Sequence, residues 1–133
     1  ERVAGNRIEA RIPDNAGITP PAGPIDAAAA PELWTTFPWH QAPSSPQWQC
    51  SHSAGTYVCN TLMFQLLIWA KDEGKRAGFI HVPLLASQTP KVAGTPQMDD
   101  DAAAAALTHI IRFSLDSMTA GGPPPNPEIP PGV

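Results

Sequence analysis

The sequence is short of the features that mark several large classes of protein. Its 133 residues include two cysteines, one tyrosine and only 15% charged residues. Two cysteines cannot form a disulfide framework, and there is no CxxC motif. The longest apolar run is too short to cross a bilayer, which excludes a transmembrane protein. Eight Lys and Arg residues are scattered along a chain of net charge −4, so the basic stripe typical of nucleic-acid binding is missing.

Other absences concern the compartment and the start of the chain. Residue 1 is Glu, with no initiator Met and no signal peptide, so we expect a fragment or a processed product. A Cys50–Cys59 bridge in a secreted binding module stays an alternative, but nothing marks the chain as secreted. We therefore favour the reducing cytoplasm. No pair of Cys and His has zinc-finger spacing, so we expect no metal site.

Proline is abundant, and its distribution divides the chain. Of the 17 prolines, none lies between Pro46 and Pro83, whereas six fall within the last eleven residues. This distribution predicts a packed middle and a terminal tail with no core of its own. We expect residues 1–120 to belong to one domain and residues 121–133 to form a disordered, Pro-rich tail.

Alternating strand and helix signals run through the middle of the chain. Residues 48–53 read as a strand, and a helix follows, with Thr56 as a candidate N-cap and Gly74 as its stop. Within that helix every residue from 62 to 70 except Gln65 is apolar, which predicts burial on more than one side. Residues 77–82 form an apolar run that suits a strand buried on both faces.

A second helix is expected after residue 99. Asp99, Asp100 and Asp101 place negative charge where a helix macrodipole favours it. An apolar stripe at helical spacing then follows, comprising Leu107, Ile110, Ile111, Leu115 and Met118. Strand, helix, strand and helix in this order predict an α/β architecture.

This arrangement makes two residues candidates for catalysis, Cys59 and His81. Cys59 lies in the first turn of its helix, where the dipole and free N–H groups favour a thiolate. His81 ends the next expected strand and could serve as the base, with His52 as a competitor. Parallel strands would bring Cys59 and His81 to the same edge of the sheet. The alternative is structural, because a cysteine and a histidine in such settings are often packing residues.

Three segments resemble one known family. Residues 53–60 (SAGTYVCN) are similar to the nucleophile segment of the pyroglutamyl peptidase I family, the pyrrolidone-carboxylate peptidases. Residues 78–83 (GFIHVP) resemble its histidine segment, and residues 1–15 resemble its acidic segment. The resemblance covers about residues 1–119 and leaves the Pro-rich tail outside it.

The resemblance implies roles for named residues. Cys59 corresponds to the nucleophile of a cysteine peptidase, His81 to its general base and acid, and Glu1 to the carboxylate that orients the histidine. Asp14 is the fallback for that third role, with Arg11 supporting the region.

Two more residues are implied in substrate binding. Tyr57 and Val58, just before the nucleophile, would line the pyroglutamyl pocket. The substrate would be a peptide with an N-terminal pyroglutamyl residue, which the enzyme removes by hydrolysis.

The resemblance also implies a fold and a setting. The expected fold is a three-layer α/β/α sandwich with a twisted mixed sheet, of which the N-terminal part is missing here. The family is intracellular, uses no cofactor and is often homo-oligomeric. Because the family's chain extends well upstream of Glu1, we expect this fragment to be inactive alone. The alternative function is a truncated, inactive remnant that acts as a folding or assembly partner.

Overall fold

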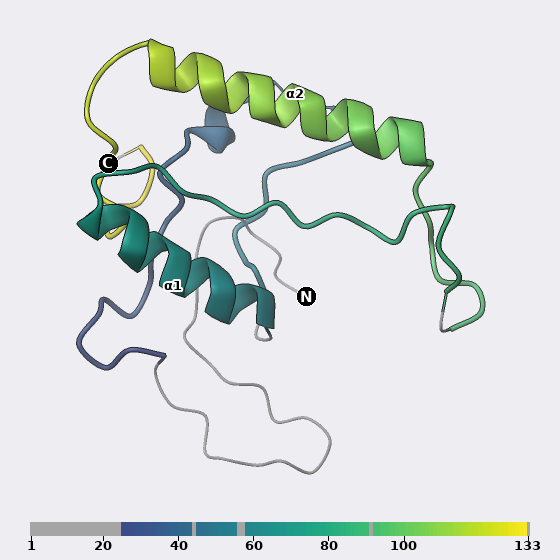
Figure 1. The fold of residues 1–133 in the computed structure, drawn as a ribbon, viewed down its shortest axis with the longest axis horizontal. Helices are drawn as coiled ribbons and strands as arrows, with labels where there is room; N and C mark the ends of the chain where they lie inside the picture. The colour runs from purple at the N-terminus through teal and green to yellow at the C-terminus, as the bar shows by residue number, and fades with distance from the viewer. Residues whose placement is uncertain (1–24, 44, 56–57, 91, 133) are drawn as a thin grey trace.

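Two long helices dominate the computed structural model, which describes residues 25–43, 45–55, 58–90 and 92–132. A short 3-10 helix, η1 (Trp39–Gln41), precedes α1 (Val58–Asp72) and α2 (Asp100–Thr119). Figure 1 shows α1 and α2 as separate rods, joined by a long segment that runs out from the end of α1 and turns back into α2. No helix within the described ranges is both long and apolar enough to span a membrane.

Helix α1 packs through one face. Its buried residues recur at spacings of three and four, so they form one stripe along the helix: Asn60, Met63, Phe64, Leu67 and Ala70. The opposite face is open, with Val58 76% exposed and Leu62 54% exposed. The sequence predicts cover on more than one side, whereas the described residues cover a single side of α1.

The end of α1 is the one the sequence predicts. Gly74 adopts a φ of 62°, a left-handed conformation that glycine reaches without strain. The Lys75 N–H donates to the Ala70 carbonyl, and the Gly74 N–H donates to the Lys71 carbonyl. This is the Schellman pattern, which satisfies the last free carbonyl groups of the helix.

The core joins α1 to two segments that are distant in the sequence. Leu33 and Ala77 are buried with the α1 residues in one apolar cluster. The Thr36 N–H donates to the Ala77 carbonyl at 3.0 Å, and the Ala77 N–H donates to Thr36 Oγ1 at 2.6 Å. These bonds satisfy buried backbone groups and fix where the segment leading to His81 crosses the core.

The backbone at Gly78 passes close to the side chains of Thr35 and Trp39. A Cβ atom placed on Gly78 would lie 2.5 Å from Thr35 Oγ1 and 2.5 Å from the Trp39 ring. Such distances are well inside van der Waals contact, so a residue with no side chain is required here.

The two expected strands are not present as strands. Among the described residues the only β pairings are isolated bridges, Ser45 with Trp48 and Leu85 with Met98. Residues 48–53 and 77–82 therefore belong to no ladder. A strand exists only where the N–H and C=O groups of successive residues pair with a neighbouring strand. In the described segment 77–82, the backbone pairing is the single hydrogen bond from the Thr36 N–H to the Ala77 carbonyl. The sandwich expected from the family resemblance is thus not formed by the described residues.

Helix α2 begins as predicted. The Asp99 side chain accepts a hydrogen bond from the Ala102 N–H at 3.0 Å and caps the helix. Hydrogen bonds from the Ser87 side chain and backbone N–H lower the pKa of the Asp100 carboxyl and tie the preceding loop to the first turn. Gly121, with a φ of 87°, follows the last turn at the predicted stop.

The packing of α2 differs from the predicted stripe. Its buried residues are small, namely Ala103, Ala106 and Ser114. Of the predicted apolar stripe, Ile111, Leu115 and Met118 are about half exposed. The Trp39 indole N–H donates to Ser114 Oγ at 2.8 Å and links η1 to the helix. Small buried residues and a few polar contacts, rather than the predicted apolar stripe, therefore attach α2 to the rest of the described chain.

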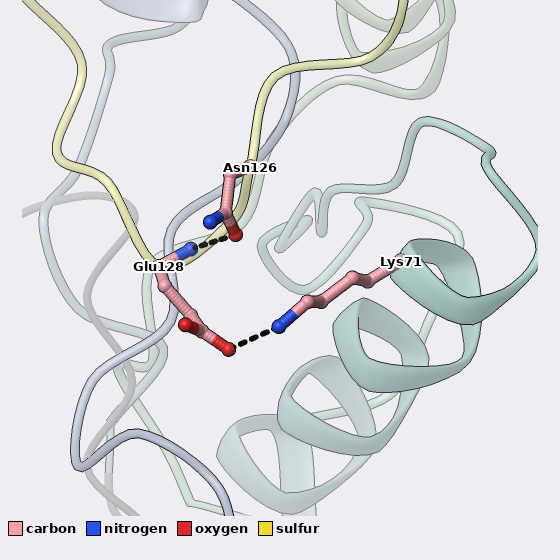
Figure 2. Close-up of polar contacts among 3 residues, drawn as sticks. All are labelled: Lys71, Asn126 and Glu128. Atoms are coloured by element: carbon pink, nitrogen blue, oxygen red, sulfur yellow. Dashed lines mark hydrogen bonds and ion pairs between the residues drawn. The ribbon is translucent and has the colours of Figure 1, made fainter.

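The Pro-rich tail turns back toward the C-terminal end of α1 (Figure 1). Pro127 is fully buried, and its carbonyl accepts a hydrogen bond from the Trp34 N–H. Figure 2 shows Glu128 held between Lys71, with which it forms an ion pair, and the Asn126 side chain, which accepts the Glu128 N–H at 3.0 Å. These contacts place the segment on the domain surface, whereas the sequence predicts a disordered tail.

Candidate active site

Cys59 occupies the second position of α1. Its thiol is free, and the residue is half-buried. The first N–H groups of a helix have no partner within the helix, and the macrodipole is positive at this end. The structure therefore places Cys59 in the helix-start setting that the sequence predicts.

The residues beside Cys59 differ sharply in environment. Val58, a predicted pocket residue, is 76% exposed at the first position of α1. Asn60, on the other side, is fully buried, and both polar atoms of its side chain are without a hydrogen-bond partner in the part of the chain that the structure describes. Tyr57 and Glu1 lie outside the described residues, as do the alternatives Asp14 and Arg11.

His81 follows the core crossing at residues 77–78. Its side chain is exposed, and its ring meets the edge of the Phe79 ring at a centroid distance of 6.4 Å. No hydrogen bond within the described ranges joins His81 to Cys59. Hydrogen bonds between catalytic groups are commonly long before substrate binds, so the separation of the two side chains leaves their predicted roles open.

A cavity of about 540 Å³ connects these segments. His81 lines it together with Met63 from α1 and Ile110 from α2. Cys59 itself is not among the lining residues, but it precedes Met63 by four positions and so lies on the same side of α1, one turn earlier. The cavity therefore reaches from His81 to α1 at Met63, one helical turn past Cys59.

Sequence reasoning missed several residues of this cavity. Trp39, Trp48 and Cys50 line it beside His81. No local pattern could have found them, because the cavity assembles segments around residues 39, 48, 80 and 110 that come together only in the folded chain. Cys50 and Cys59 are not joined by a disulfide bond, so the disulfide alternative is not formed in the structure. Within the described part of the chain, no three His, Cys, Asp or Glu side chains gather to hold a metal ion.

Comparison with known proteins decides the family. The family model of the pyroglutamyl peptidases matches residues 1–116. The chain belongs to this family. The match includes both Cys59 and His81, and it ends before the Pro-rich tail. The resemblance seen in the three sequence segments is thereby confirmed.

Relatives of this pyroglutamyl peptidase family member are similar over most of the chain. The pyrrolidone-carboxylate peptidase of Erwinia tasmaniensis is 36% identical over 135 residues, covering 92% of this chain and 62% of the relative. Pyrrolidone-carboxylate peptidase 2 of Caldanaerobacter subterraneus is 41% identical over 105 residues, covering 74% of this chain and 51% of the relative. The chain thus spans about 60% of the length of the relatives it matches.

Solved structures extend the similarity to the fold. The pyrrolidone carboxyl peptidase of Thermococcus litoralis superposes with a TM-score of 0.63 at 34% identity, covering 97% of this chain and 63% of that one. The pyroglutamyl peptidase I of Bacillus amyloliquefaciens gives a TM-score of 0.58 at 31% identity, with 85% and 57% covered. The chain therefore shares the α/β fold of these peptidases over the matched part.

Proposed function

We propose that this chain carries the nucleophile and the general base of a cysteine peptidase that removes N-terminal pyroglutamyl residues from peptides. The observation that carries the proposal is the free, half-buried Cys59 thiol in the first turn of α1, within a chain that the family model matches over residues 1–116. His81 supports it, because it lines a cavity that also reaches Met63, one helical turn past Cys59 in α1.

The chemistry assigned to these residues proceeds in two stages. The Cys59 thiolate attacks the main-chain carbonyl carbon of the pyroglutamyl residue, and the oxyanion that forms is stabilised by the Cys59 N–H at the helix start. His81 then protonates the leaving nitrogen as the C–N bond breaks, which leaves a thioester. In the second stage His81 removes a proton from water, the hydroxyl attacks the thioester, and the free thiol is restored.

The remaining predicted residues support this reaction. Glu1 accepts a hydrogen bond from the His81 ring and holds it in the productive tautomer. Tyr57 and Val58 contact the lactam ring of the substrate. Pyroglutamate has no α-ammonium group, so a pocket without a carboxylate would bind it in preference to a charged N-terminus, whose desolvation would not be compensated.

The proposal extends to setting and partners. Two cysteines that form no disulfide bond fit a reducing compartment, so we assign the protein to the cytoplasm. The substrate is a peptide blocked by pyroglutamate, and a homo-oligomer is the expected assembly. The alternative of an inactive remnant gains no support from the relatives, which are named as peptidases.

The test compares two thiols under one assay. Pyroglutamyl-amide hydrolysis is measured for residues 1–133 and for a chimera in which they replace the matched part of the Thermococcus litoralis peptidase, because the chain spans 63% of that protein. Cys59→Ser should lower kcat/KM by on the order of 10³-fold or more. Cys50→Ser should retain measurable hydrolysis, because Cys50 only lines the cavity.

The assay can also overturn the proposal. Loss of activity in Cys50→Ser together with retained activity in Cys59→Ser would show that Cys50 is the nucleophile, and the assignment to Cys59 would be wrong. Equal hydrolysis of glutaminyl and pyroglutamyl amides would indicate a general aminopeptidase instead.

A further inference from the structure

The cavity beside His81 is lined by apolar side chains and by neutral polar side chains. Its apolar surface comes from α1, η1, α2 and the segments between them, comprising Trp39, Trp48, Met63, Phe79, Ile80 and Ile110. Gln47, Gln49, Ser51 and Ser53 supply neutral polar groups. None of the described residues that line it is Asp, Glu, Lys or Arg. A basic side chain entering this cavity would lose its water without gaining a carboxylate partner.

The two indole walls are held in place before any ligand binds. The Trp39 N–H donates to Ser114 Oγ, and its ring stacks on Phe37 at a centroid distance of 5.4 Å. The Trp48 ring lies 5.6 Å from the His109 ring of α2. Pre-positioned aromatic walls lower the entropy cost of binding, because few side chains need to be ordered on association.

The position of the cavity relative to the chemistry suggests its occupant, an argument that rests on the proposed function. His81 protonates the nitrogen of the leaving residue, so that residue must begin within hydrogen-bonding distance of His81. His81 is itself a lining residue of the cavity. The side chain of the leaving residue is therefore the part of the substrate that can reach the apolar walls.

We propose that this cavity binds the side chain of the residue that follows the pyroglutamyl group, and that it selects large apolar and aromatic side chains. At about 540 Å³ it has the size of a small-molecule site and holds a phenyl or indole side chain. Basic side chains at that position are disfavoured, because the lining offers them no carboxylate.

A binding experiment on residues 1–133 tests the cavity without requiring activity. The chain has four tryptophans, of which Trp39 and Trp48 line the cavity while Trp34 and Trp69 do not. With 5-fluorotryptophan labelling, L-phenylalaninamide should shift the ¹⁹F resonances of Trp39 and Trp48 and leave those of Trp34 and Trp69 in place. Glycinamide, which has the same amine and amide but no side chain, should shift none. Equal shifts of all four resonances, or none with L-phenylalaninamide, would overturn the proposal.

A kinetic experiment separates this inference from the proposed function. In the chimera, kcat/KM for pyroglutamyl-phenylalaninamide should exceed that for pyroglutamyl-lysinamide, whose side chain carries a charge, by about tenfold or more. Trp48→Ala should remove most of that preference, because it deletes one of the two indole walls. Trp69→Ala is the matched control, because its indole is 49% exposed and lies outside the cavity. Equal rates for all pyroglutamyl substrates would refute the cavity assignment but not the proposed function. If no pyroglutamyl substrate is hydrolysed, the proposed function is refuted, and the ¹⁹F experiment then decides whether the cavity binds the phenyl side chain.

Discussion

Thr36 and Ala77 are joined by three hydrogen bonds across 41 positions of the sequence, and this pairing fixes the segment that leads to His81. Both residues are buried, with Thr36 1% exposed and Ala77 5% exposed. The position of His81 relative to α1 therefore depends on a polar contact in the core and on apolar packing together.

Removing the Thr36 hydroxyl should be costly. Thr36→Val keeps the shape of the side chain but leaves the buried Ala77 N–H without its acceptor. We expect a loss of about 1–3 kcal/mol in the free energy of unfolding, measured by urea denaturation. Thr108→Val is the matched control, because its hydroxyl bonds to the Ala104 carbonyl on the exposed surface of α2. Equal losses for the two variants would contradict the assigned role of Thr36.

Gly78 should tolerate no side chain. Gly78→Ala places a methyl group 2.5 Å from Thr35 Oγ1 and from the Trp39 ring, so one of these groups must move. We expect a destabilisation of about 1–3 kcal/mol and a changed near-ultraviolet circular dichroism signal from Trp39. Ala105→Ser adds one atom at an exposed position of α2 and should change neither quantity. An unchanged melting curve for Gly78→Ala would show that the approach is looser than the structure indicates.

Asn60 offers a test of what faces the start of α1. Its amide is fully buried and unpaired among the described residues, which costs free energy that an apolar side chain of similar size would not. We expect Asn60→Leu to leave the stability of residues 1–133 unchanged or raised, and Asn60→Asp to lower it, as measured by thermal denaturation. A clear loss of stability in Asn60→Leu would mean that the amide has a partner outside the described ranges.

The tail contacts should differ in strength. The Lys71–Glu128 ion pair is over one third exposed on both side chains, so Glu128→Ala should cost less than about 1 kcal/mol. Ending the chain at Gly122 removes the buried Pro127 as well and should cost more, on the order of 1–3 kcal/mol. Denaturation curves of the two variants measure the difference, and a truncation no worse than Glu128→Ala would show that burial of Pro127 contributes little.

Residues 1–133 expressed alone should expose apolar surface on both α1 and α2. Val58, Leu62 and Trp69 expose one apolar face of α1, and Ile111 and Leu115 expose another on α2. We expect the chain to bind an apolar dye such as ANS and to show little or no pyroglutamyl hydrolysis, while the chimera binds less dye and is active. A monodisperse, fully active chain without dye binding would refute this prediction.

Local signals in the sequence predicted local features well. The acidic start of α2 at residues 99–101, the Gly74 stop and the place of Cys59 at a helix start each depend on a few neighbouring residues, and the structure has all three. The expected strands at residues 48–53 and 77–82 failed because a strand is defined by its neighbour, which no run of residues can specify by itself. The cavity was unpredictable for the same reason, since Trp48 and Ile110 meet only after folding.

The segment that contains Trp34, Thr36 and Trp39 forms its hydrogen bonds with residues that the ribosome adds much later in the chain. Its partners are Pro127, Ala77 and Ser114, the last of them 75 positions away. Contacts of such long range require large loops to close first, which slows folding. During synthesis this segment must wait until α2 and the tail have left the ribosome, so a stalled or shortened chain would leave two indole rings and Leu33 open to aggregation or to chaperones.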